Sequence, residues 1–147
     1  MQPSNKRDLL YLLRMLNHIE LCSYFTKDVC VEDDLIKNHY EKFHLATSQL
    51  IQLAENVNKT SEELKTTYRE IDWQKIKGFR NIIVHEYINV DSDIVFEIIK
   101  IELPILKEQI SYIINIGLKN NTYDIAEFNV ARVSEKYALI DFSKFNL

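Results

Sequence analysis

The sequence predicts an all-α protein built as a bundle of four to five helices. Only two glycines and two prolines occur in 147 residues, whereas turn-rich β folds need many more. Apolar residues also recur three and four positions apart along several long segments, which is the period of an amphipathic helix. The length fits a single domain that can bury its own hydrophobic core.

The first two helices are predicted from their apolar stripes. One runs from about Asn5 to Thr26 and the next from about Asp34 to Asn58. The acidic stretch Glu32-Asp33-Asp34 is interpreted as a helix start and not as a metal site, because carboxylates are favourable at a helix N-terminus. The stripes consist of Leu9, Leu12, Leu13, Leu16 and Ile19 in the first helix, and of Ile36, Tyr40, Phe43, Leu50, Ala54 and Val57 in the second.

Capping signals place the next two helices. Thr60-Ser61-Glu62-Glu63 has the Thr-x-x-Glu form of a capping box, which predicts a short helix that ends near Tyr68. Asp72 is the predicted N-cap of a third main helix, from Trp73 to about His85.

The fourth main helix is the most apolar segment. It is predicted from about Asp93 to Ile116, after a turn at residues 89–92, with Pro104 expected to kink or restart it and Gly117 expected to cap its end. Of the 27 positions from 91 to 117, 14 are apolar. A single stripe would use fewer, so we expect a second apolar face that meets another chain, which predicts a homodimer.

The last segment, LKNNTYDIAEFNVARVSEKYALIDFSKFNL, differs in character from the rest. It is too rich in aromatic and β-branched residues to be disordered, and its mixed periodicity fits either short strands or a helix. It is expected to pack on the bundle or on a partner. We therefore divide the chain into a helical domain, residues 1–117, and a C-terminal extension, residues 118–147.

Composition excludes several functional classes. The net charge of −4 argues against a surface that coats nucleic acid, although it allows a small phosphate site. No secretion signal is visible, and no apolar run approaches the roughly 20 residues of a membrane span. Cys22 and Cys30 have no metal-binding spacing and are interpreted as reduced thiols. These features predict a cytoplasmic protein without membrane contact.

The stretch FRNIIVHEY carries the strongest chemical signal. It sets Arg80, His85 and Tyr87 around an apolar run, with Lys75 and Lys77 just before it and no acidic residue from Gln74 to Arg80. Cutting RNA without a metal needs proton transfer and a cation on the phosphate. Histidine suits the first task and arginine the second. Helix-dipole compensation is the alternative explanation of a cationic helix end.

Helix geometry limits how these residues can cooperate. Arg80 and Tyr87 are seven residues apart and share a face. His85 lies about 140° around the helix from Arg80 and ~7.5 Å along it, so one straight helix cannot bring both into one tight site. Either the helix ends near His85 or two copies meet at a two-fold axis. Neighbouring Asn81 is a candidate supporting donor to phosphate or to His85.

Other aromatic and imidazole groups are interpreted as structural. Trp73 and Phe79 are expected to anchor the third helix in the core, with stacking on bases as the alternative. His18, His39 and His44 fit no metal template, and we expect no cofactor and no metal.

The segment DWQKIKGFRNIIVHEYINVD resembles the signature of the HEPN superfamily and, within it, of the HepT-like toxins, which carry Arg-x4-His-x-Tyr, here Arg80, His85 and Tyr87. Similarity extends from about Lys6 to Ile116. It includes Trp73 and the Ile-x-Gly ahead of the motif, Asn81 within it and Asp91 after it. Upstream, LIQLAENVNKTSEEL is similar to the second helix and short capped helix of the family, and IIKIELPILKEQI to its last helix.

The resemblance implies a dimeric helical bundle whose Arg80 and His85 residues line a shared cleft and cleave RNA, either tRNA or mRNA, without metal. Lys75 and Lys77 would contact the RNA. It also implies a toxin–antitoxin pair, in which a minimal nucleotidyltransferase antitoxin attaches AMP to Tyr87. A non-catalytic HEPN-type binding partner of a nucleotidyltransferase is the alternative, and retention of Arg80 and His85 favours the nuclease.

Overall fold

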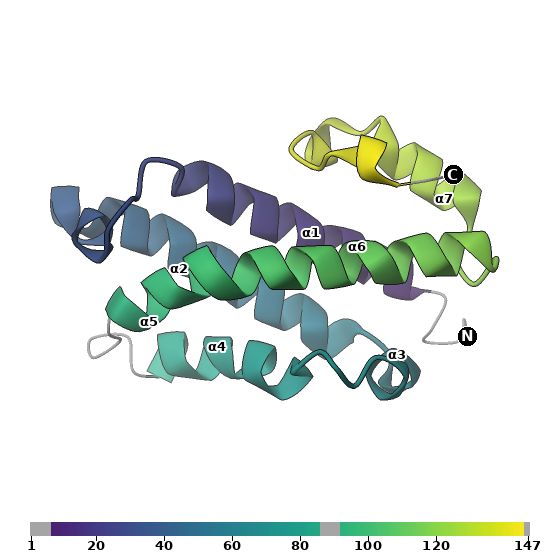
Figure 1. Ribbon diagram of the computed structural model, residues 1–147, viewed down its shortest axis with the longest axis horizontal. Coiled ribbons are helices and arrows are strands. Elements are labelled where there is room, and N and C mark those ends of the chain that lie inside the picture. The colour runs from purple at the N-terminus through teal and green to yellow at the C-terminus, as the bar shows by residue number, and fades with distance from the viewer. Residues whose placement is uncertain (1–6, 86–91, 146–147) are drawn as a thin grey trace.

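The structure, a computed structural model, describes residues 7–85 and 92–145, with the backbone alone at Ile82, Val84 and His85. The described residues are all-α, as predicted, and contain no strand. Four long helical rods form the bundle (Figure 1). They are α1 (Asp8–Phe25), α2 (Lys37–Lys59), α4 (Trp73–His85) and a composite rod of α5 (Ser92–Glu97), a π-helical turn (Ile98–Glu102) and α6 (Leu103–Lys119); shorter helices α3 (Glu62–Thr67) and α7 (Ile125–Arg132) complete the fold.

One continuous hydrophobic core joins these rods. The predicted stripe of α1 is buried in full, and the stripe of α2 is buried from Phe43 onward. The predicted inward positions of Ile36 and Tyr40 are wrong, because both side chains are exposed. Among the described residues, no helix is long and apolar enough to cross a membrane.

The start of α2 explains why Tyr40 turns outward. Glu32–Leu35 form a 3₁₀ turn, as the predicted helix start requires, but Asn38, His39 and Tyr40 then take left-handed backbone angles with φ of 55°, 59° and 63°. Left-handed geometry costs an L-residue about 1–2 kcal/mol. This kink breaks the helical phase between Ile36 and Phe43, so the regular period expected from Asp34 does not hold there.

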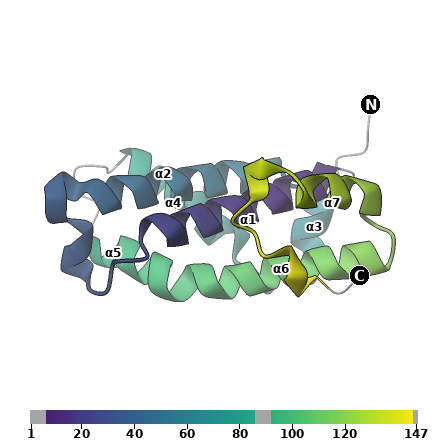
Figure 2. The same cartoon turned by 90° about the horizontal axis from the view of Figure 1, so that it is seen from above.

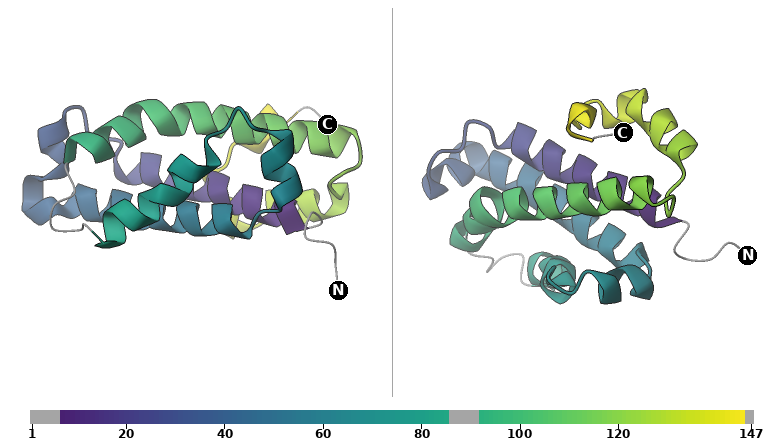
Figure 3. Two further views of the ribbon diagram at one scale, coloured as in Figure 1. Left: turned by 90° about the horizontal axis from the view of Figure 1, so that it is seen from below. Right: turned by 45° about the vertical axis from the view of Figure 1, so that its right-hand side comes forward.

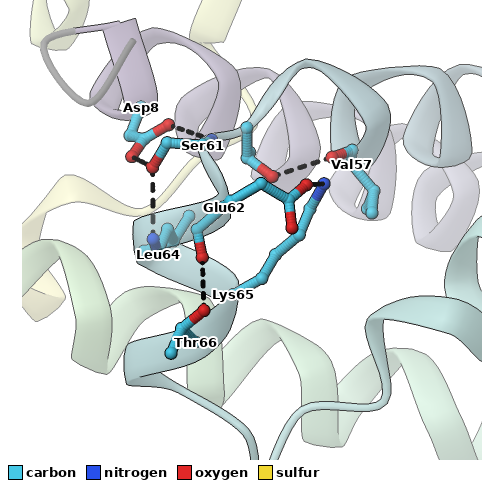
Figure 4. Close-up of polar contacts among 8 residues, drawn as sticks. Asp8, Val57, Ser61, Glu62, Leu64, Lys65 and Thr66 are labelled. Carbon is cyan, nitrogen blue, oxygen red and sulfur yellow. Dashed lines mark hydrogen bonds and ion pairs between the residues drawn. The ribbon is translucent and has the colours of Figure 1, made fainter. Parts of the chain in front are cut away.

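The short helix α3 begins one residue later than predicted. Ser61, not Thr60, is the N-cap, and its hydroxyl oxygen accepts a hydrogen bond from the Leu64 amide at 3.1 Å (Figure 4). The Thr60 hydroxyl instead donates to the Val57 carbonyl oxygen at 2.7 Å, at the end of α2. The expected Thr-x-x-Glu box is therefore replaced by a serine cap.

Asp8, at the start of α1, binds this cap. Its carboxylate accepts hydrogen bonds from the Ser61 amide at 2.8 Å and from the Ser61 hydroxyl at 2.5 Å (Figure 4). The side chain is only 2% exposed, and burial raises the pKa of its carboxyl group. The contact joins the first helix to the α2–α3 connection, 53 residues away.

Replacing Asp8 tests this contact. Asp8→Ala leaves two buried Ser61 donors unpaired and is expected to lower the free energy of unfolding by about 1–3 kcal/mol. Asp8→Asn keeps an acceptor for the amide. Because the folded pKa is raised, the contribution of Asp8 to stability is complete below the unfolded pKa and is lost as pH rises through the folded value. Asp8→Asn is therefore expected to gain stability relative to the wild type as the pH rises above the ordinary aspartate pKa of about 4, measured by urea unfolding. A pH-independent difference would contradict this expectation.

The composite rod runs through Pro104 without a break. The π-helical turn just before it lets the Leu103 amide reach the carbonyl oxygen of Ile98, five residues back. A proline removes a donor and crowds the carbonyl four residues before it, and the wider π turn absorbs that crowding. Pro104 thus sits in the first turn of α6, so the expected restart of the helix takes the form of a π segment without a sharp kink.

Gly117 does not end the last rod, so its predicted role as a C-cap is wrong. The helix continues to Lys119, and Asn121, with φ of 61°, takes the left-handed position after it. Gly117 instead makes room for Tyr123: a Cβ atom there would lie 2.1 Å from a ring carbon of Tyr123. The Tyr123 amide also donates to the Gly117 carbonyl oxygen at 2.9 Å.

After Lys119 the chain folds back as α7 and two 3₁₀ turns, with no strand in the described part of the extension. Phe128, Tyr137, Ile140 and Phe145 are buried and join the common core. The extension lies on the side of the bundle away from α4 (Figures 1 and 3) and crosses over α1 when seen from above (Figure 2). Since α6 runs to Lys119, the predicted boundary at 117/118 falls within a helix.

Candidate ribonuclease site

Helix α4 positions the predicted site. Its N-cap is Asp72, as predicted, since the Asp72 carboxylate accepts a hydrogen bond from the Lys75 amide at 3.0 Å. Trp73 and Phe79 are buried, and the Trp73 indole donates to the Tyr68 carbonyl oxygen at 3.0 Å. Both aromatic residues are therefore core anchors, as interpreted. They fix the rotation of α4, and so determine which of its other residues reach the surface.

Arg80 reaches the surface on the side of α4 that packs against α2. Its side chain is 42% exposed and forms an ion pair, through Nε, with Oε1 of Glu55. Glu55 belongs to α2 and is 37% exposed. Half-buried placement suits a phosphate contact, because the guanidinium stays accessible while neighbouring helices limit its freedom.

The two predicted RNA-binding lysines lie on different sides of α4. Lys75 forms an ion pair with Glu102, on the composite rod, and this hydrogen bond raises the pKa of its ammonium group. Lys77 is exposed. On a helix Lys77 lies about 60° from Arg80, whereas Lys75 lies about 140° away. The structure therefore brings Lys77 to the side of Arg80, and turns Lys75 toward another helix.

The remaining motif residues stand at and beyond the end of α4. Asn81 is exposed beside Arg80. The described part of α4 reaches His85, and the position of the His85 imidazole lies outside the description. Tyr87, the predicted modification site, and Asp91 lie outside the described residues.

The other histidines and the two cysteines differ in burial. The His18 ring lies 2.8 Å from the Gln49 side-chain oxygen, and burial lowers the pKa of that imidazole. His39 and His44 are exposed. Cys22 is a buried thiol whose pKa burial raises to about 12, and Cys30 is exposed. Across residues 7–85 and 92–145, no group of three or more His, Cys, Asp or Glu side chains could hold a metal ion.

An apolar surface lies along the composite rod and reaches α4 on the side of Lys75. Ile94, Ile101, Ile105 and Tyr112 follow one another at spacings of seven, four and seven residues, and the last three are each 57% exposed. Ile105 also lines a groove of about 260 Å³ between α4 and α6, together with Ile76 and Phe79. The second apolar face expected from the sequence is thus present and open in the single chain.

Sequence reasoning missed Glu55. It is 25 residues from Arg80 and belongs to no motif, so neither spacing nor composition points to it. Its partner becomes visible only when α2 and α4 are packed. The sequence shows only that Glu55 is an acidic residue near the end of α2, and this does not identify the helix that Glu55 faces.

Comparison with known proteins supports the sequence-based assignment. The family of HepT-like ribonucleases matches residues 15–113, a range that contains α4 and most of the bundle. No solved structure matches the chain. The family match ends before α7, so the C-terminal extension lies outside it.

Individual relatives agree with this match. A Methanocaldococcus jannaschii protein named as a gamma-glutamylcyclotransferase and provisional RNase is 26% identical over 129 residues, 86% of this chain but only 57% of that protein. A second protein of that organism, provisionally named an RNase, is 30% identical over 74% of this chain and 93% of its own length. A Thermococcus cleftensis protein named a probable ribonuclease HepT is 28% identical over 66% and 86%. The chain therefore belongs to the family of HepT-like ribonucleases, within the HEPN superfamily.

Proposed function

We propose that this protein is a metal-independent endoribonuclease and the toxin of a toxin–antitoxin pair. The observation that carries the proposal is the placement of Arg80. It is half-exposed on α4, five residues before His85, and inside the segment matched by the ribonuclease family. A buried arginine or a motif outside the family match would not support it.

In the proposed reaction, the 2′-hydroxyl of RNA attacks the adjacent phosphorus and the 5′-oxygen of the next nucleotide leaves. The imidazole of His85 transfers protons, because its ordinary pKa of about 6.5 permits both forms near neutral pH. The guanidinium of Arg80 stabilises the extra negative charge on the phosphate oxygens in the transition state. Asn81 is proposed to donate a further hydrogen bond, and Lys77 to bind a neighbouring phosphate. Lys75, held by Glu102, is a weaker candidate for RNA contact.

The direct test is incubation of the purified chain with RNA in the presence of EDTA. Cleavage is expected to continue and to leave 2′,3′-cyclic phosphate ends, because the 2′-oxygen remains bonded to phosphorus. Cleavage that stops with EDTA and returns with Mg²⁺ would assign the reaction to a metal. Products with free 2′- and 3′-hydroxyl groups would contradict attack by the 2′-oxygen.

The proposed site is composite and needs two copies of the chain. Arg80 and His85 are about 140° apart around α4, so each copy would supply its arginine and histidine to a cleft at the two-fold axis. The exposed apolar surface of Ile94, Ile101, Ile105 and Tyr112 runs beside α4 and supports this geometry. A partner chain that covered this surface would bring a second α4 close to the first.

Light scattering in solution is expected to give twice the 17.4 kDa of one chain at micromolar concentration. Ile105→Asp places a charge in the proposed interface and is expected to produce monomers with little RNase activity. Val130→Asp, which changes an exposed apolar residue on α7, is the matched control and is expected to leave the dimer intact. A wild-type monomer, or a dimer that tolerates Ile105→Asp, would contradict this interface.

The proposed antitoxin is a minimal nucleotidyltransferase that attaches AMP to the Tyr87 hydroxyl. The added phosphodiester would carry a negative charge and a nucleoside into the neighbourhood of Arg80 and Lys77. RNA phosphates would then meet repulsion and a steric block at the same place. The proposed pair acts in the cytoplasm, where tRNA and mRNA are available.

A further inference from the structure

We infer that Glu55 is a positioning residue that orients the Arg80 guanidinium toward the scissile phosphate. This inference rests on the proposed ribonuclease function. Its starting point is the ion pair between Arg80 Nε on α4 and Glu55 Oε1 on α2. The two residues are 25 positions apart, so the contact is not a local pair within one helix.

The nitrogen used in this contact matters. Nε is the inner nitrogen of the guanidinium and carries one of its five N–H donors. A carboxylate held there fixes the plane of the group. It leaves the edge formed by the two terminal nitrogens, and that edge is the one that can hold two phosphate oxygens in a bidentate contact. A contact at Nε is therefore compatible with a phosphate bound at the terminal edge of Arg80.

The exposure of both side chains shows how strongly this ion pair can restrain Arg80. Arg80 is 42% exposed and Glu55 is 37% exposed, so the ion pair is reached by water and salt. Ion pairs of this kind are weak in free energy, too weak to keep a guanidinium from an RNA phosphate. They are sufficient to favour one rotamer of a long side chain among many, which is what pre-organisation of a catalytic cation requires.

The charge of Glu55 gives the proposal a distinctive signature. A carboxylate close to the phosphate site repels RNA, so its removal is expected to leave RNA affinity unchanged or slightly stronger. Its removal also frees the Arg80 side chain, so the chemical step is expected to slow. A residue that only held α2 against α4 would, when removed, weaken stability and RNA binding together.

The experiment compares Glu55→Ala, Glu55→Gln and Glu55→Asp with the wild type, measuring kcat and KM on one RNA. Glu55→Ala is expected to lower kcat by about 10- to 100-fold with KM unchanged or lower. Glu55→Gln keeps an oxygen that can accept from Nε and is expected to recover most of kcat. Glu55→Asp is one methylene too short to reach and is expected to resemble Glu55→Ala.

A matched control and an independent readout complete the test. Glu20→Ala removes another carboxylate that bridges two helices, through Lys107 at 2.6 Å, and is expected to leave kcat and KM unchanged. In ¹⁵N NMR, the Nε–H signal of Arg80, assigned by its loss in Arg80→Lys, is expected to exchange faster with water in Glu55→Ala than in Glu55→Gln.

The outcomes are separable. Wild-type kcat in Glu55→Ala, or a kcat higher than wild type, would overturn the positioning role of Glu55 while Arg80 keeps its proposed task. Equal losses in Glu55→Gln and Glu55→Ala with a raised KM would identify a structural contact and would overturn it as well. Full activity in Arg80→Ala would remove the proposed function itself, and with it the basis of this inference.

Discussion

His85→Ala and Arg80→Ala are each expected to slow RNA cleavage by a factor of ~10² or more, because each removes a group that acts only in the transition state. The two losses have different signatures. Without His85, no side chain of the motif can transfer protons near neutral pH, and the pH dependence that imidazole gives to the rate is expected to disappear. Without Arg80, that pH dependence is expected to remain in the residual rate. In cells, both variants are expected to relieve growth arrest.

Matched variants separate chemistry from folding. His44→Ala removes an exposed imidazole from α2, and Arg69→Ala removes an exposed guanidinium from the α3–α4 connection. Both are expected to cleave RNA at the wild-type rate. Thermal unfolding of His85→Ala and Arg80→Ala is expected to stay close to wild type, since Arg80 is half-exposed and its ion pair is weak. A folded His85→Ala variant with full toxicity would reject the proposed mechanism.

Local signals predicted the helices well, because their causes lie within a few residues. The α1 stripe is a periodic pattern, and the Asp72 cap is one hydrogen bond between residues three positions apart. Both features could therefore be predicted from the sequence. Trp73 and Phe79 could be assigned to the core for the same reason: large aromatic residues on an amphipathic helix face inward.

Errors occurred where a distant residue decides the local structure. Thr60 and Ser61 are equally good caps by type, and Asp8, far away in the chain, is the partner that satisfies Ser61. Gly117 has the residue type of a helix C-cap, yet it is a glycine because the ring of Tyr123 occupies the space that a side chain would need. The left-handed turn at residues 38–40 contains no glycine, so composition gave no warning of it.

In the candidate site, too, local features could be predicted and distant partners could not. Arg80 and His85 could be identified as candidate site residues because the family signature lies within one short segment of the sequence. The partners of its cations could not be predicted: Glu55 holds Arg80 from α2, and Glu102 holds Lys75 from the composite rod. In three dimensions the basic run therefore divides: Lys77 lies on the side of Arg80, whereas Lys75 and Arg80 pair with carboxylates on two different helices.

Tyr87→Phe is expected to remain a nuclease and to escape silencing by the antitoxin. The ring is kept, so packing changes little, and the acceptor oxygen for AMP is removed. Tyr87 stands two residues beyond His85, the last described residue of α4. A phenol that follows a helix end and a glutamate is expected to be reachable by a transferase, whereas a core tyrosine is not.

Co-expression with a minimal nucleotidyltransferase, or incubation with it, ATP and Mg²⁺, is expected to add AMP to Tyr87 of the wild type. The purified, modified chain is then expected to lose RNA binding and cleavage even after the transferase is removed, because the new negative charge stays beside Arg80 and Lys77. Intact-mass spectrometry and RNA cleavage measured on one sample link the two effects. Tyr24→Phe, which changes an exposed tyrosine near the end of α1, is the matched control and is expected to be modified and silenced normally. If the transferase neutralises toxicity while Tyr87 stays unmodified, inhibition proceeds by complex formation, and the charge-based switch proposed for Tyr87 is wrong.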